Sequence, residues 1–110
     1  MHIAVLDLGT NTFHLLIAER DSNCEAHFLS KNKIYVKLAE EGIGHIGEAA
    51  FQRGLDALRT FKVELDAAGV QAANIRALGT AALRTADNAP DFLQQAAEIL
   101  GIRPEIVPGE

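Results

Sequence analysis

Two nearly continuous hydrophobic runs open the chain, Met1 to Leu6 and Phe13 to Ala18. Runs without regular alternation are typical of strands buried on both faces of a sheet. Between them, residues 7–12 interrupt the pattern with an acid, a glycine and small polar side chains. The two runs therefore predict a hairpin with an exposed polar tip.

A third, weaker strand is predicted over residues 24–30, after a turn at residues 21–23. Its lower hydrophobicity favours a position near the edge of a sheet. Alternating apolar residues at 34, 36 and 38 extend this strand or add a short one. Three glycines between residues 42 and 47 then end the regular structure.

The clearest helix is predicted over residues 48–68, and Gly69 is expected as its C-terminal cap. Its apolar residues recur at helical spacing, and we interpret this stripe as core packing. The stripe consists of Phe51, Leu55, Leu58, Phe61 and Leu65.

The remaining pattern predicts a strand, a helix and a strand. The strand covers residues 75–78, and the helix covers residues 89–100, with Asn88 as its N-cap and Gly101 closing it. A last strand is predicted over residues 102–107.

Composition and charge narrow the functional classes. The hydrophobic and charged fractions, 48% and 23%, are those of an ordinary soluble globular protein, and no apolar run could cross a bilayer. The net charge of −5 argues against a general DNA-binding surface. The opening residues lack the features of a secretory signal, and Cys24 is the single cysteine, so we expect a cytoplasmic protein. Strand-edge packing is expected for Cys24.

The turn at residues 7–12 has two interpretations. Glycine and asparagine tolerate positive φ, so hairpin geometry alone explains its composition. However, Asp7 ends an aliphatic strand, where a carboxylate is costly unless it is solvated, paired or near a metal. The turn also offers several backbone N–H groups, two hydroxyls and an amide to an oxyanion, and phosphate is the leading ligand. Because the chain returns as a strand, this is neither a Walker loop nor a dinucleotide fingerprint.

The loop from Thr80 to Asn88 also has two interpretations. In the first, Thr80 caps a short helical turn and Arg84 pairs with Asp87 on the surface, a contact that contributes little to the stability of the fold. Alternatively, the first and fourth strands are parallel neighbours, so that both polar loops meet at one rim and Arg84 binds phosphate through two hydrogen bonds. Another group of cations, Lys31, Lys33 and Lys37, is either a solvated face or steers a polyanionic substrate.

Residues 7–16, Asp-Leu-Gly-Thr-Asn-Thr-Phe-His-Leu-Leu, resemble the first phosphate-binding motif of the exopolyphosphatase and guanosine-pentaphosphate phosphohydrolase (Ppx/GppA) family. Residues 80–88 are similar to its Thr-x-Ala-x-Arg-x-Ala-x-Asn signature. The resemblance implies an α/β fold, the ribonuclease H-like half-domain of actin-like ATPases, with a mixed sheet of about five strands and flanking helices. The predicted order of elements agrees with this fold.

The resemblance also implies a reaction, hydrolysis of the terminal phosphoanhydride of polyphosphate or guanosine pentaphosphate. Arg84 is the implied catalytic residue, and Asp7 is the implied ligand of Mg²⁺. The implied phosphate-binding residues are Gly9, Thr10, Asn11, Thr12, Arg84 and Asn88.

Two departures from the family pattern limit what is carried over. His14 stands where the family often has arginine, and Glu110 falls on a variable position, so the general base is expected beyond residue 110. We expect residues 1–110 to be the N-terminal domain of a larger two-domain protein, inactive alone, with homodimerisation left open. Two rival functions also stay open: an actin-like kinase or ATPase that releases ADP, and a noncatalytic module that binds polyphosphate or an alarmone.

Overall fold

The computed structural model describes residues 1–23 and 25–107, so the interpretation of Cys24 lies outside the described residues. The elements in chain order are β1 His2–Leu8, β2 Thr12–Arg20, β3 Ala26–Tyr35, α1 Glu48–Ala67, a 3₁₀ turn Ala72–Asn74, β4 Ile75–Gly79, α2 Ala81–Thr85, α3 Ala89–Leu100 and β5 Glu105–Ile106. Among the described residues, none of the helices combines the length and the apolar character that crossing a membrane requires.

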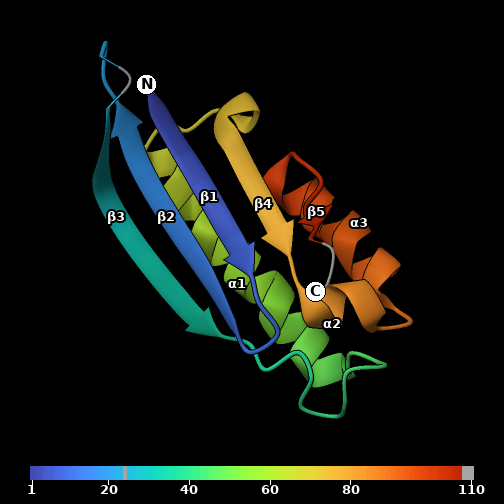
Figure 1. The fold of residues 1–110 in the computed structure, drawn as a ribbon. Helices are drawn as coiled ribbons and strands as arrows, with labels where there is room; N and C mark the ends of the chain where they lie inside the picture. Colours follow the sequence, from blue (N-terminus) through green and yellow to red (C-terminus); the bar gives the residue numbers. More distant parts are fainter. Residues whose placement is uncertain (24, 108–110) are drawn as a thin grey trace.

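Five strands form one mixed sheet in the order β3-β2-β1-β4-β5 (Figure 1). β1 pairs antiparallel with β2, and β2 with β3, whereas β1–β4 and β4–β5 are parallel pairs. The predicted α/β architecture is therefore confirmed, as are the leading hairpin, the edge position of the third strand and the parallel pairing of the first and fourth strands. β5 is shorter than predicted, and it begins directly after Pro104, which has no N–H to donate to a strand ladder.

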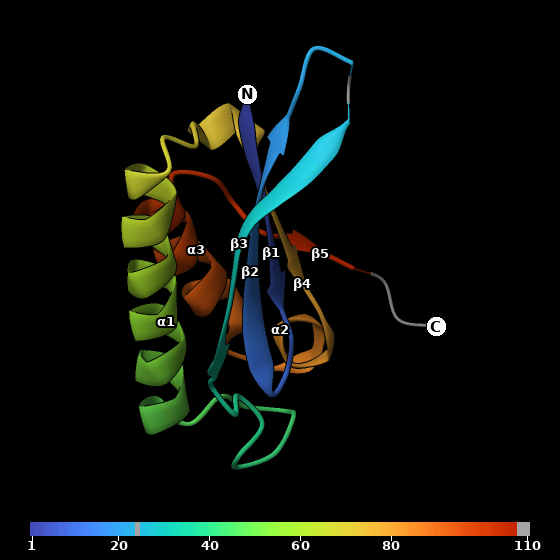
Figure 2. The ribbon, with the colours of Figure 1, turned by 90° about the vertical axis from the view of Figure 1, so that its left-hand side faces the viewer.

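α1 and α3 both pack on one face of the sheet and enclose the core with it (Figure 2). Leu55, Leu58, Phe61 and Leu65 of the predicted stripe are buried, which confirms its role in packing. Phe92 of α3 contacts two other aromatic rings edge-on. Its centroid lies 6.1 Å from that of Phe13 on β2 and 5.2 Å from that of Phe51 on α1.

Gly54 allows α1 and α3 to approach each other. A Cβ at this position would lie 2.7 Å from the ring of Phe92, closer than real Cβ contacts. Glycine lowers the helix propensity of α1 at this point, so packing explains its presence.

Burial of β1 on both faces, predicted from its hydrophobic run, is wrong. Leu6 and Leu8 point to the helices and are buried, but Val5 on the other face is 39% exposed and Asp7 is exposed as well. The reason is that both long helices cover the same side of the sheet.

The predicted helix ends agree closely with the structure. α1 ends one residue earlier than predicted and is followed by Gly69 at φ +70°, and α3 has the predicted bounds and is followed by Gly101 at φ +81°. Both glycines have the left-handed backbone conformation that glycine favours after a helix.

Candidate phosphate-binding site

The β1–β2 turn meets the start of α2 through direct hydrogen bonds. The backbone N–H of Ala82 donates to Thr10 Oγ1 at 3.1 Å. Thr80 donates to the carbonyl of Leu8 through its backbone N–H at 3.3 Å and its hydroxyl at 3.4 Å. Because β1 and β4 are parallel, both loops leave the sheet at the carboxyl edge, where ligands of α/β sheets bind. The two polar loops, far apart in the sequence, therefore converge.

The segment after β3 holds the tip of the same turn. The backbone N–H groups of Val36 and Lys37 both donate to the carbonyl of Asn11, at 2.9 and 3.0 Å, and that of Leu38 donates to the carbonyl of Thr10 at 2.8 Å. The carbonyl oxygens of Thr10 and Asn11 are thus bound to this segment, and the N–H groups of the turn remain as its backbone donors.

Three successive N–H groups of the turn are unpartnered within residues 1–23 and 25–107, namely those of Gly9, Thr10 and Asn11. A Cβ on Gly9 would lie 2.8 Å from the carbonyl oxygen of Thr12, so the turn closes too tightly for a side chain there. Consecutive unpaired N–H groups in a tight turn suit an anion, because they supply donors without a carboxylate or carbonyl to repel it.

A hollow of about 320 Å³ opens beside the turn. Its lining residues are Thr10, Asn11, Lys37, Ala39 and Glu40. Glu40 forms an ion pair with Arg53 of α1 at 2.8 Å, and the Arg53 hydrogen bond and charge lower the pKa of the Glu40 carboxyl. Arg53 also donates through Nε to the carbonyl of Val36 at 3.0 Å, so it fastens this wall of the hollow to α1.

A larger hollow of about 560 Å³ lies at the opposite end of β1 and β4. It is lined by residues near the amino ends of both strands, including Ile3 and Ile75. Size favours this hollow, but ligands of parallel α/β sheets bind at the carboxyl ends of strands. The smaller hollow has that position and also adjoins the unpartnered N–H groups, so we assign the candidate site to it.

Arg84 lies on α2, the helix that contacts the turn, and its side chain is exposed. Its Nη1 donates to the carbonyl of Val107 at 2.9 Å, beyond β5. The alternative pairing of Arg84 with Asp87 is wrong. The Asp87 carboxylate instead lies 2.6 Å from His45 Nδ1, because the chain after α2 turns toward the glycine-rich segment.

Asn88 precedes α3 at the predicted N-cap position, but its side chain does not cap the helix. It accepts a hydrogen bond from the N–H of Ile46 and donates to the carbonyl of the same residue, both at 2.9 Å. Asn88 therefore fastens the segment at residues 42–47 to the start of α3. The second N–H of the Asn88 amide is not used by these bonds, so the predicted contact with phosphate stays a prediction.

Asp7 points to the open face of β1, with His14 on β2 and Leu78 on β4 as its register partners. Its side chain is exposed, so of the three conditions expected for this carboxylate, namely solvation, pairing or a nearby metal, solvation is met. What remains for a metal role is a solvated carboxylate one residue before the end of β1.

The structure divides the predicted lysine cluster. Lys31 and Lys33 belong to β3, where their ammonium groups lie 5.0 Å from the ring of Phe28 and 5.8 Å from that of Tyr35. Lys37 follows β3 and lines the hollow beside the turn. Their sequence spacing could not reveal this difference, because the strand ends between Lys33 and Lys37.

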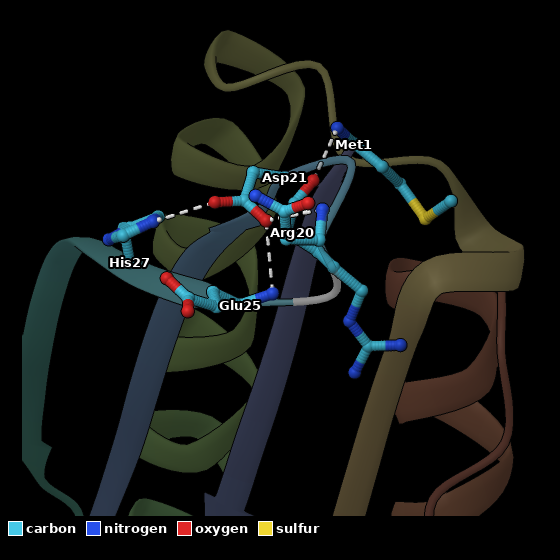
Figure 3. A network of polar contacts seen from close by, with 6 residues as sticks. Met1, Arg20, Asp21, Glu25 and His27 are labelled. Atoms are coloured by element: carbon cyan, nitrogen blue, oxygen red, sulfur yellow. Dashed lines mark hydrogen bonds and ion pairs between the residues drawn. The ribbon is translucent and has the colours of Figure 1, made fainter.

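A separate polar cluster lies at the β2–β3 hairpin tip (Figure 3). Asp21, Glu25 and His27 offer metal-ligating atoms within 4.8 Å of one another. Asp21 Oδ1 already accepts the N–H groups of Asn23 and Glu25, and Oδ2 lies 3.1 Å from His27 Nε2. The bond from the Glu25 N–H is the largest cause of a lowered pKa at Asp21. We interpret the cluster as the closure of the hairpin.

The sheet order and helix placement define a ribonuclease H-like α/β protein. The structure resembles that of Thermus thermophilus RuvC with a TM-score of 0.54 and 11% identity, over 97% of this chain and 65% of that one. This likeness concerns the fold alone.

Sequence comparison identifies the family. The Ppx/GppA phosphatase family matches residues 16–110, and the chain belongs to this family. A guanosine-5'-triphosphate,3'-diphosphate pyrophosphatase of Photobacterium profundum is 41% identical over 97% of the chain. An exopolyphosphatase from Cytophaga hutchinsonii superposes with a TM-score of 0.90 and 37% identity, also over 97% of the chain. The chain spans 21% of the first relative and 34% of the second.

Proposed function

We propose that this chain is the phosphate-binding part of a hydrolase that releases terminal phosphate from polyphosphate or guanosine pentaphosphate. The observation that carries the proposal is the hydrogen bond from Ala82 to Thr10, which joins two polar loops at the carboxyl edge of the sheet. The names of the two relatives, a guanosine-5'-triphosphate,3'-diphosphate pyrophosphatase and an exopolyphosphatase, support phosphoanhydrides as the substrate class.

In this proposal, the β1–β2 turn binds the terminal phosphate. The unpartnered N–H groups of residues 9–11 donate to its oxygens, and the side chains of Thr10, Asn11 and Thr12 add polar groups. Phosphoryl transfer requires mainly positioning and charge stabilisation, and a turn fixed from two sides supplies the positioning.

Arg84 is proposed to neutralise charge on the transferred or adjacent phosphate. One N–H of its guanidinium donates to the carbonyl of Val107. The side chain is exposed, so its other donors are available to a ligand. A guanidinium can bind two phosphate oxygens through parallel hydrogen bonds. Asn88 is proposed to act on the site through the loop that it fastens.

The donor set at Asp7 fits Mg²⁺, which is bound by one or two carboxylates together with phosphate oxygens and water. Within the described residues, the Asp7 carboxylate forms no ion pair and is exposed, so it is free to contribute one ligand. When bound, the ion would neutralise charge on the phosphate chain. The general base is proposed to belong to a second domain, so residues 1–110 alone bind phosphate weakly and do not turn over.

Binding can be tested on the 110-residue chain by amide NMR during titration with inorganic phosphate. We expect the signals of Gly9–Thr12 and of Thr80–Ala82 to shift together. Shifts confined to the larger hollow at the amino ends of β1 and β4 would contradict the site.

Turnover can be tested in a chimera in which residues 1–110 replace the matching segment of the Photobacterium profundum relative. We expect phosphate release from polyphosphate or guanosine pentaphosphate with Mg²⁺, and none from the 110-residue chain. ADP as the product from ATP would identify a kinase or ATPase instead. Saturable binding without release by the chimera would identify a noncatalytic module.

A further inference from the structure

Lys37 has a backbone conformation that lysine seldom adopts. Its φ is +49°, in the left-handed region, whereas the other residues with positive φ among those described are glycines. Glycine reaches this region more readily than lysine because it has no Cβ, and asparagine does so because its short polar side chain can hydrogen-bond to the local backbone. The backbone geometry alone therefore does not explain a lysine at this position.

The segment around Lys37 is fixed from two sides. Its own N–H and that of Val36 donate to the carbonyl of Asn11, which ties the segment to the β1–β2 turn. On the other side, Arg53 donates to the carbonyl of Val36 at 3.0 Å and to the Glu40 carboxylate at 2.8 Å. The Cα of Lys37 is thus held beside the turn in a defined conformation.

Charge in the hollow beside the turn is unevenly compensated. The Glu40 carboxylate is paired with Arg53, whereas Lys37 forms no ion pair within the described residues. The charge of Lys37 also helps to lower the pKa of the Glu40 carboxyl, but it is the smallest of the causes, so the ammonium of Lys37 stays available to a ligand. The lining contains no aromatic ring on which a nucleobase could stack, so it fits an inorganic phosphate chain better than a nucleoside.

We infer that Lys37 forms a second phosphate subsite, which binds an internal phosphate of linear polyphosphate while the β1–β2 turn holds the terminal one. The inference rests on the proposed function. A lysine ammonium is a compact cation with rotatable donors, which suits an internal phosphate whose position varies because the polyphosphate chain is flexible.

The test compares inorganic phosphate with inorganic tripolyphosphate as ligands of the 110-residue chain. Lys37→Gly and Lys37→Asn remove the ammonium and accept the left-handed backbone, whereas Lys37→Arg keeps a cation. Lys33→Ala removes the same charge from β3 and serves as the control. Dissociation constants are followed through the amide signals of residues 9–12, and circular dichroism checks folding.

We expect Lys37→Gly and Lys37→Asn to weaken tripolyphosphate binding by about three- to tenfold and to change phosphate binding by less than about twofold. Lys37→Arg and Lys33→Ala should retain the wild-type ratio of the two affinities. Equal losses for both ligands, or none for tripolyphosphate, would overturn the subsite. If the wild-type chain shows no phosphate shifts at residues 9–12, the proposed function itself fails and the subsite with it.

Discussion

The Thr10 hydroxyl accepts a hydrogen bond from the backbone N–H of Ala82, although the two residues are 72 positions apart. The first N–H groups of a helix have no partner within the helix. Thr10 satisfies one of these groups in α2, so the turn and the helix hold each other in place. The geometry of the candidate site and the stability of the domain thus depend on the same side chain.

Thr10→Val should destabilise the domain by about 1–2 kcal/mol, because it leaves the partly buried N–H of Ala82 without an acceptor. Phosphate binding should weaken as well, since the turn loses one of its supports. Urea unfolding and a phosphate titration measure the two effects. Thr10→Ser should retain both properties, and Thr60→Val on the exposed face of α1 should stay within about 0.5 kcal/mol.

Arg84→Ala in the chimera should lower phosphate release by about a hundredfold or more, because it removes the cation proposed to stabilise the transferred phosphate. The melting temperature should change by less than about 2 °C, since the side chain is exposed. Arg59→Ala, which removes another exposed arginine from α1, is the control. Rates equal to those of the parent chimera would end the assignment of Arg84.

Asp7→Asn in the chimera should raise the Mg²⁺ concentration needed for half-maximal phosphate release by about tenfold or more, because a neutral amide is a poor ligand of this ion. The measurement is a Mg²⁺ titration at saturating substrate. Asp56→Asn is the control, because it removes a carboxylate from α1, at a distance from the candidate site. An unaltered titration for Asp7→Asn would remove Asp7 from the metal site.

Gly54→Ala should destabilise the domain by about 1–2 kcal/mol despite the higher helix propensity of alanine. The added Cβ would lie 2.7 Å from the Phe92 ring, and the strain of overpacking should exceed the gain in propensity of about 1 kcal/mol. Urea denaturation gives the value. Gln52→Ala, two residues earlier on the exposed side of α1, should be nearly neutral. A stabilised Gly54→Ala variant would show that α1 and α3 can move apart.

Glu40 should titrate below its ordinary pKa of 4.5, chiefly because Arg53 donates a hydrogen bond to its carboxylate. A lowered pKa means that the pair stabilises the fold above pH 4.5 and that this contribution is lost as the pH falls through the lower, folded-state pKa. Carbon NMR of the carboxyl group measures the titration. In Arg53→Gln the pKa should return toward 4.5, and an unchanged value would exclude the pair in solution.

Periodicity alone predicted the elements that bury a continuous face. The stripe on α1, the bounds of α3 and the hairpin of β1 and β2 follow from local patterns, and the structure confirms them. The hydrophobic run of β1 was misleading about its second face. Which face of a sheet receives helices depends on connections between elements, and these connections are not encoded in the composition of a single strand.

The side-chain partners in the site were less predictable than the fold. The sequence placed the two polar loops at one rim, but it paired Arg84 with Asp87 in one alternative and made Asn88 a helix cap. In the structure, Asp87 and Asn88 both bind the segment at residues 42–47. Glycine-rich segments have no hydrophobic period from which their position could be deduced. The contacts of Asp87 and Asn88 with this segment could therefore not be predicted from the sequence pattern.

The position of β1 in the sheet has a mechanical consequence for the turn that follows it. β1 is paired along both of its edges, with β2 and β4, and β2 is paired on both edges as well. Amides of such interior strands are usually among the last to exchange with solvent. The turn therefore connects two interior strands of the sheet, and an incoming anion would meet donors that are already arranged, with little entropy lost in ordering them.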